Sequence, residues 1–247
     1  MRVDLLESKA CVDWAISQLP SLDERINAWL DLNVNLEIKD PDPNSPNNVI
    51  VAAQKEPLPA AFNIEVGSHI NTIRSSLDIL ATSLAHRYGI AKPDEAYFPV
   101  AKSEDDFLGG NFKGAKFVKA LPTAERTIIE TLKPYRGGNA PLWVLHQLDI
   151  VRKHRKLLAV ATTPARFSIT GWGLSDNFTP VASGFMIIED QETVLGLLRK
   201  GAPDYNMKFS AFVAINETDL SIHKPVVAAL NDFARLADSI IQLFDVS

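Results

Sequence analysis

The chain has 247 residues, of which 46% are hydrophobic and 22% are charged, and its net charge is −5. This composition is typical of a globular protein and excludes a chain that is disordered over most of its length. The acidic balance also argues against a protein that coats nucleic acid without sequence preference, because such binding depends on clustered Lys and Arg. A local basic cluster could still bind an anion.

The cysteine count and the hydropathy of the chain bear on its compartment. Cys11 is the only cysteine, which excludes an intramolecular disulfide and a thiolate-rich zinc site. No apolar run approaches the roughly 18 residues that span a bilayer. Residues 1–20 carry acidic side chains where a signal peptide needs an uninterrupted apolar stretch. We therefore expect a cytoplasmic protein with no membrane association.

The N-terminal part of the chain is predicted to form a helix and then two strands. Residues 3–18 have apolar side chains at helical spacing, and Pro20 is expected to end this helix. Apolar and polar residues alternate over residues 28–38, which is typical of a half-buried strand. The turn sequence DPDPNSPNN, residues 40–48, precedes a second strand, VIVAAQ, at residues 49–54.

The central part of the chain is predicted to be helical. A long helix over residues 65–89 has apolar side chains at heptad spacing and ends at a glycine. Residues 108–119, rich in Gly and Lys, are expected to form a loop. A short helix over residues 123–135 and a longer one over residues 137–158 follow, the latter with Pro141 in its first turn.

The C-terminal part is predicted to return to strands and to end in a helix. Strand patterns occur in RFSITGWG (166–173), SGFMIIE (183–189) and MKFSAFVAIN (207–216). Residues 224–244 form an amphipathic pattern, and this closing helix could dock on the core or pair with a second copy in a homodimer.

The order of these elements defines the expected fold class. Strands lie on both sides of the helical centre, which covers about residues 58–158, so neither part has a self-sufficient pattern. We therefore expect a single α+β domain over residues 1–247. Its helical bundle core would pack with an antiparallel β-sheet built from N-terminal and C-terminal strands.

Three polar residues stand beside the apolar stripe of the long central helix. At 100° per residue, Arg74 lies about 40° from Ile70, Asp78 about 80° and Asn71 about 100°. They therefore occupy the shoulder of the buried face and could line a site. The alternative is a structural pair at i,i+4, in which Asp78 is the partner that a partly buried Arg74 requires.

A second group of polar residues lies in HQLDIVRKHRK, residues 146–156. His146, Asp149 and Lys153 share one helical face, and residues 152–156 are five basic residues in a row. His146 and Asp149 could be two ligands of a divalent metal, but a metal site needs further ligands, so no cofactor is predicted. The basic run could hold a phosphate or carboxylate, or it could simply complement the helix dipole.

A resemblance connects these motifs. The segments EVGSHINTIRSSLDILA, YFPVAKSEDDF, LPTAERTIIETLKPY and PLWVLHQLDIVRKHRKLL resemble a widespread group of uncharacterised bacterial proteins. Those proteins share R-S-x-L-D-H and D-K-H-R motifs, and the similarity covers about residues 58–158. The Arg-x4-His spacing in the first motif resembles that of HEPN domains, helical bundles that are often RNases. Here Arg74 and Asp78 match, whereas Ile79 replaces the histidine.

The resemblance implies a function in RNA or nucleotide binding, with cleavage as one form of it. Arg74 would contact the phosphate and Asp78 would orient it. Because Ile79 replaces the expected histidine, His154 with Lys153 and Arg155 would supply proton transfer or charge stabilisation. HEPN sites usually form across a dimer interface and need no metal.

Two other functions are consistent with the same residues. The first is a small-molecule-binding or hydrolytic α+β protein with a polar pocket between helices and sheet, lined by Asn71, Arg74, Asp78, His146 and Asp149, and its partner would be a small anionic ligand. The second is a non-catalytic interaction protein in which both polar groups only fix helix packing.

Overall fold

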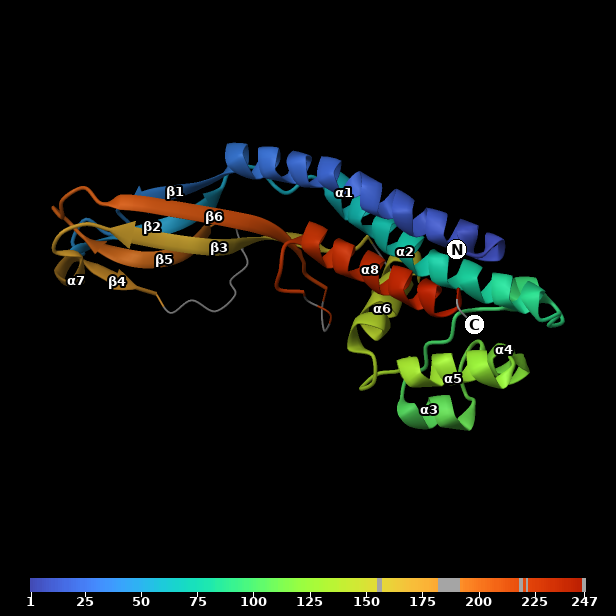
Figure 1. The fold of residues 1–247 in the computed structure, drawn as a ribbon. Coiled ribbons are helices and arrows are strands. Elements are labelled where there is room, and N and C mark those ends of the chain that lie inside the picture. The colour runs from blue at the N-terminus through green and yellow to red at the C-terminus, as the bar shows by residue number, and fades with distance from the viewer. Residues whose placement is uncertain (155–156, 182–191, 218–219, 221, 246–247) are drawn as a thin grey trace. The chain divides into compact units, whose positions relative to one another are not determined.

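The computed structural model describes residues 1–154, 157–181, 192–217, 220 and 222–245. Contacts between residues divide the chain into two compact units (Figure 1). The helical unit comprises Met1–Pro20, Asn63–Leu158 and Val227–Ser247, and the sheet unit comprises Ser21–Phe62 and Ala159–Val226. The predicted α+β class is confirmed, and the expectation of a single domain over residues 1–247 stays a prediction.

The first long helix extends further than the sequence pattern predicted. Helix α1 runs over Leu6–Asn33 with Pro20 inside it, so the predicted end at Pro20 is wrong. The predicted strand over residues 28–38 is correct only from residue 34 onward, where β1 covers Val34–Lys39. Pro20 has no N–H to donate to the carbonyl of Ile16, four residues earlier in the helix. Pro20 is exposed, so this carbonyl can bond to water instead. A buried stripe at helical spacing outweighs the proline and the alternation: Leu19, Leu22, Ile26 and Leu30.

The helical unit is built around α2, which covers Ala60–Arg87. The first part of α1 packs on it, and Ser8 Oγ donates to the carbonyl of Ser76 at 2.6 Å. Arg87 Nη1 donates to the carbonyl of Phe244, just beyond helix α8 (Val226–Leu243), at 3.1 Å. The predicted heptad stripe is confirmed, because all of its members are fully buried: Ile70, Ile73, Leu77, Leu80 and Leu84.

Shorter helices complete this unit. The predicted loop over residues 108–119 is partly wrong, because it overlaps two short helices. Ser103 caps the first of them, and its hydroxyl accepts from the backbone N–H of Asp106 at 3.1 Å. The helices predicted from residues 123 and 137 are confirmed with small shifts at their ends. The bounds are Glu104–Gly109 for α3, Ala115–Ala120 for α4, Thr123–Leu132 for α5 and Ala140–His154 for α6, with 3-10 turns at Val3–Leu5 and Pro93–Glu95.

The sheet unit contains an antiparallel four-stranded sheet in the order β1-β2-β5-β4. Strands β1 and β2 come from the N-terminal part and β5 and β4 from the C-terminal part, which confirms the predicted composition of the sheet. Ile50 of β2 is buried in a cluster with Leu198 of β5 and Tyr205. The bounds are Asn47–Gln54 for β2, Phe178–Pro180 for β4 and Glu192–Arg199 for β5.

A two-stranded ribbon also belongs to this unit. Strand β3 (Val160–Thr170) pairs antiparallel with β6 (Asn206–Ile215), so two of the predicted C-terminal strands are confirmed. A single helical turn, α7 (Leu174–Asn177), follows β3. The strand predicted for SGFMIIE falls in residues 182–191, outside the described residues.

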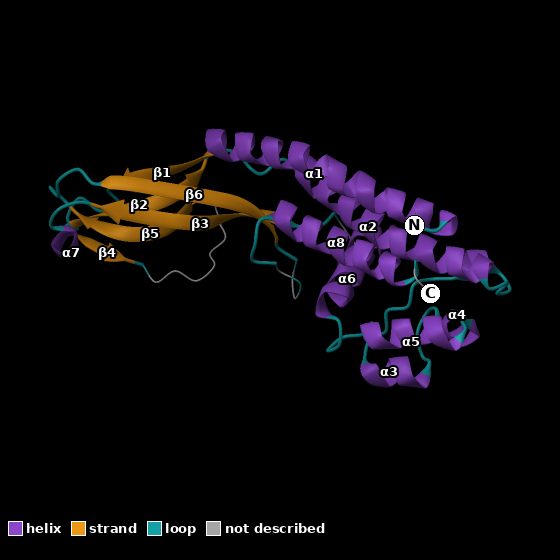
Figure 2. Ribbon diagram, viewed as in Figure 1, coloured by secondary structure: helices purple, strands orange, loops and turns teal. Residues whose placement is uncertain are grey.

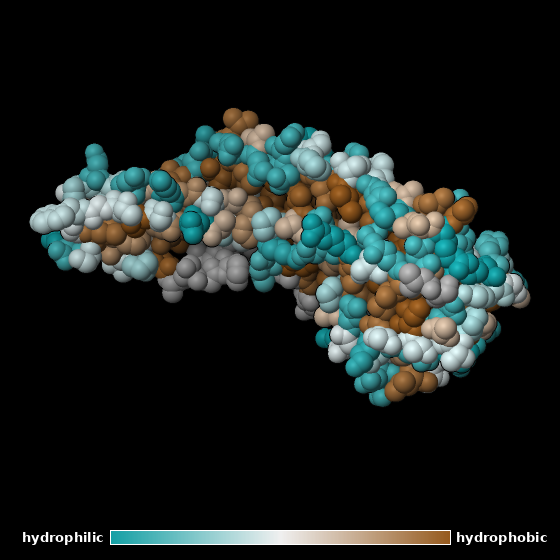
Figure 3. Space-filling view, viewed as in Figure 1, coloured by the Kyte–Doolittle hydropathy of each residue, from teal (hydrophilic) through white to brown (hydrophobic). Residues whose placement is uncertain are grey.

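The two units differ in secondary structure. Figure 2 shows that helices form the helical unit, while the strands lie in the sheet unit. In Figure 3 the visible face of the helical unit is mostly polar, with separate hydrophobic patches between the polar areas. Within the part of the chain that the structure describes, no helix combines the length and the hydropathy needed to cross a bilayer.

Candidate functional site

Arg74 lies at the centre of a hydrogen-bond network inside the helical unit. Its side chain is almost fully buried, with the residue 3% exposed. Nη1 donates to Asp78 Oδ1 at 2.8 Å and Nη2 donates to the carbonyl of Phe98 at 2.9 Å. Nε donates to Nδ1 of His146 on α6 at 3.2 Å. The predicted i,i+4 pair is therefore present, and Arg74 uses all three of its nitrogens to connect α2, α6 and the segment at Phe98.

Asp78 completes this network by binding the same backbone unit. Its Oδ1 accepts from the backbone N–H of Phe98 at 3.0 Å in addition to Arg74. Both polar backbone groups of Phe98 are thus satisfied by side chains one turn apart on α2. Since Phe98 is 1% exposed, these bonds remove the cost of burying its peptide groups.

A second network joins α2 to α6 one turn away. Asn71 Nδ2 donates to Asp149 Oδ1 at 3.0 Å. Asp149 is buried, and its Oδ2 forms an ion pair with Lys153 Nζ at 2.7 Å. Six of the predicted site residues therefore converge at the contact of α2 with α6: Asn71, Arg74, Asp78, His146, Asp149 and Lys153.

His146 is held in its neutral form. Burial is the largest effect and, together with the positive charge of Arg74, lowers the pKa of His146 to about 4. Lys153 and Lys113 lower this pKa further, while Asp149 opposes them. Because Nδ1 accepts from Arg74, the neutral ring carries its proton on Nε2. His146 is thus a hydrogen-bond donor at Nε2, not a base, near neutral pH.

A cavity of about 250 Å³ opens beside these residues. Among the residues that the structure describes, its charged lining consists of three cations and two carboxylates, which leaves a net positive charge. The ligand favoured by such a cavity is an anion, which would also gain from the low local dielectric of a partly enclosed site. The lining comprises Arg74, Asp78, Tyr97, Phe98, Val100, Lys113, His146, Asp149, Ile150 and Lys153.

Lys113 and Tyr97 belong to this site and were not predicted. Lys113 lies between α3 and α4, and its Nζ is 3.4 Å from the centre of the Tyr97 ring, a cation–π contact. Among the cations of this cavity, Arg74 and Lys153 each pair with a carboxylate, whereas the ring of Tyr97 is the contact that the structure gives for Lys113. The glycines that flank Lys113 were the available signal, because they permit a tight loop.

The loop that carries Lys113 depends on Gly114. Its φ is +94°, and a Cβ added there would lie 2.7 Å from the carbonyl oxygen of Tyr97. We expect Gly114→Ala to lower the free energy of unfolding by about 2–3 kcal/mol, measured by urea titration, since it adds a clash to an unfavourable backbone conformation. Gly137 is a matched control, because its φ is +90° and no atom lies within 4 Å of the added Cβ.

Gly137→Ala should report the cost of the backbone conformation alone, about 1 kcal/mol. The excess loss in Gly114→Ala then measures the contact with Tyr97. Equal losses in the two variants would show that the Lys113 loop is not fixed by this contact.

Two of the predicted site residues cannot be assigned to the site. His154 is the last residue of α6, and its side chain lies outside what the structure describes, as does Arg155. Over the described residues there is also no group of three or more His, Cys, Asp or Glu side chains arranged to hold a metal ion.

Comparison with known proteins finds no protein-family model, characterised protein or solved structure that matches this chain. Two partly buried networks join α2 to α6, and a small positively charged cavity lies beside them. The resemblance to HEPN domains stays a prediction.

Proposed function

We propose that the helical unit binds a small oxyanion, carried as a phosphate or carboxylate group, in the cavity beside His146. The observation that carries the proposal is the lining of this cavity, in which Lys113, Lys153 and Arg74 outnumber Asp78 and Asp149. The cavity, about 250 Å³ in volume, is large enough to hold a phosphate or carboxylate group. The proposal develops the small-anion alternative rather than cleavage of RNA.

Each polar residue has a distinct part in the proposed binding. The ammonium groups of Lys113 and Lys153 would supply charge, and Nε2–H of His146 would supply a neutral hydrogen bond. Arg74 would act indirectly, because each of its three nitrogens already donates a hydrogen bond and Nε holds His146 in one tautomer. Asp149 would restrain Lys153 through their ion pair.

Binding and cleavage of RNA, with Arg74 as the phosphate contact, is the competing proposal. It requires a phosphate to reach one of the two guanidinium N–H groups of Arg74 that its three hydrogen bonds do not use, although the residue is 3% exposed. This RNA proposal is tested by measuring cleavage of single-stranded RNA in the presence of a metal chelator. Cleavage that persists in pure protein and disappears in a folded Arg74→Lys variant would favour it over oxyanion binding alone.

We expect Lys113→Gln to weaken the binding of inorganic phosphate by about tenfold, because among the described residues Lys113 is the cation of this cavity that contacts an aromatic ring and no carboxylate. Isothermal titration calorimetry with phosphate measures the dissociation constant directly. Lys113 is exposed, so the variant should retain the stability of the parent.

Lys208→Gln is the matched control. Lys208 is an exposed lysine of β6 that does not line the cavity beside His146. Its replacement by Gln changes the net charge of the protein by the same amount as Lys113→Gln. If the two variants weaken phosphate binding equally, the effect comes from overall charge and not from the cavity. A parent protein that does not bind phosphate or acetate at about 10 mM would contradict the proposed function.

A further inference from the structure

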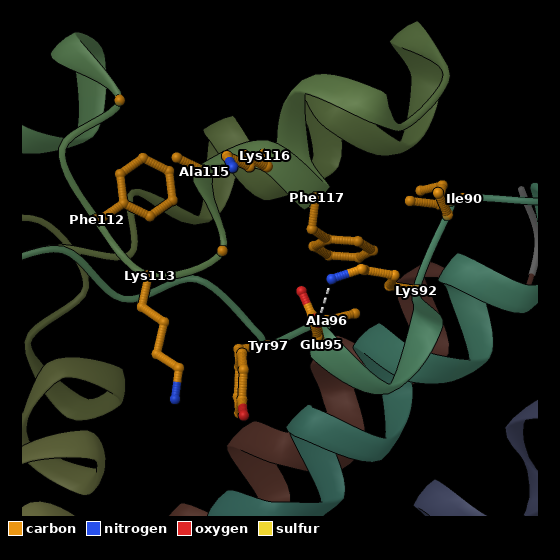
Figure 4. A pocket seen from close by; sticks show the side chains of 13 residues that line it. Ile90, Lys92, Glu95, Ala96, Tyr97, Phe112, Lys113, Ala115, Lys116 and Phe117 are labelled. Carbon is orange, nitrogen blue, oxygen red and sulfur yellow. Dashed lines mark hydrogen bonds and ion pairs between the residues drawn. The ribbon is translucent and has the colours of Figure 1, made fainter.

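A second and larger cavity is lined by the loop that carries Lys113. Its volume is about 650 Å³, within the usual range for pockets that hold small organic ligands. Figure 4 shows the side chains of Tyr97, Phe112, Lys113 and Phe117 around it. The cavity belongs to the same unit as the oxyanion site.

The two cavities have two residues in common. Tyr97 and Lys113 each line both the larger cavity and the one beside His146. They also contact each other, with the ammonium of Lys113 above the ring of Tyr97. A ligand whose charged group meets Lys113 in the smaller cavity could therefore place the rest of its structure in the larger one.

The walls of the larger cavity combine flat apolar side chains with a positive charge. Phe112, Phe117 and Ile90 supply the apolar surface, which suits a planar ring. Glu95 is the one carboxylate among the described residues of this lining, and Lys92 holds it in an ion pair of 2.7 Å. Lys113 and Lys116 then leave a positive excess in this cavity as well.

From these observations we infer that the ligand is a phosphate monoester of a ring compound, with its phosphate beside His146 and Lys113 and its ring in the larger cavity. The inference rests on the proposed oxyanion binding. A phosphate monoester is preferred to a carboxylate because it carries close to two negative charges near neutral pH, which matches the positive excess in both cavities.

The test compares inorganic phosphate, phenyl phosphate and benzoate by isothermal titration calorimetry. Phenyl phosphate is expected to bind about tenfold more tightly than inorganic phosphate, because the ring adds apolar contact area. Benzoate, with a single charge, is expected to bind more weakly than phenyl phosphate. The full chain is used in all titrations.

A pair of variants locates the ring. Ala91 is exposed and lines the larger cavity, so Ala91→Trp should fill it without changing the core. We expect this variant to lose the advantage of phenyl phosphate and to keep the affinity for inorganic phosphate. Phe112→Ala, which removes part of the apolar wall, should act in the same direction. Ala120 is exposed and lines neither cavity, so Ala120→Trp should change neither affinity.

The outcomes separate this inference from the proposed function. If inorganic phosphate does not bind, both fail. Should inorganic phosphate bind while phenyl phosphate binds no better, only the ring assignment is overturned. It is likewise overturned if Ala91→Trp and Phe112→Ala both keep the advantage of phenyl phosphate. Benzoate that binds as tightly as phenyl phosphate would overturn the assignment of the charged group as a phosphate.

Discussion

Replacing Arg74 by methionine is expected to lower the free energy of unfolding by about 3 kcal/mol, although the substitution keeps the side chain long and unbranched. The loss arises because three acceptors lose their donor together: Asp78, the carbonyl of Phe98 and Nδ1 of His146. Phe98 is 1% exposed, so its carbonyl regains few bonds to water. Urea unfolding followed by fluorescence measures the change.

Arg235→Met is the matched control for this variant. Arg235 is an exposed residue within α8, so its replacement should change the free energy of unfolding by less than about 0.5 kcal/mol. An Arg74→Met protein that is as stable as the Arg235→Met protein would show that the network is dispensable. It would also favour Arg74 as a residue kept for ligand contact, as the RNA-binding proposal requires.

Stability is expected to fall with decreasing pH in a manner that depends on His146. Its pKa in the folded protein is about 4, below the ordinary value of 6.5, so the unfolded chain binds the proton more readily between these values. The contribution of His146 is therefore complete above about pH 6.5 and is lost as the pH falls toward 4. We expect a loss of about 2 kcal/mol between about pH 7.5 and pH 5.

A His146→Gln variant isolates this contribution, because an amide oxygen can accept from Arg74 and does not titrate. Urea unfolding at the two pH values should give a smaller loss in the variant than in the parent. His86 is exposed, so His86→Gln should keep the loss of the parent. If the parent and His146→Gln proteins lose the same free energy of unfolding between the two pH values, titration of Asp and Glu side chains explains the loss. His146 is then not held neutral by the fold.

The elements that the sequence predicted well are those with one dominant periodicity. The stripe from Ile70 to Leu84 repeats through α2 without interruption, and every member of it is buried. In α1 two periods compete over residues 28–33, and the alternation is misleading there because Leu30 also continues a helical stripe from Leu22. Burial of that stripe is a tertiary effect, which a local pattern cannot weigh against Pro20.

The candidate site also has a part that the sequence predicted and a part that it did not. Arg74, Asp78, His146 and Asp149 were predictable because spacing on two helices places them on definite faces. Their pairing across α2 and α6 was not, because it depends on how the helices pack. Lys113 was assigned to a loop, and its approach to Tyr97 depends on the turn at Gly114 and on a contact with the backbone. Sequence spacing carries no information on such contacts.

The bonds from α2 to Phe98 have a consequence for sequence change in this segment. Arg74 and Asp78 recognise the carbonyl and the N–H of residue 98, which are the same for every amino acid except proline. The segment could therefore change its side chains, within the limits of core packing, and still be held along the same path. Substitution of residue 74 or 78, in contrast, would release the main chain that forms one wall of the cavity.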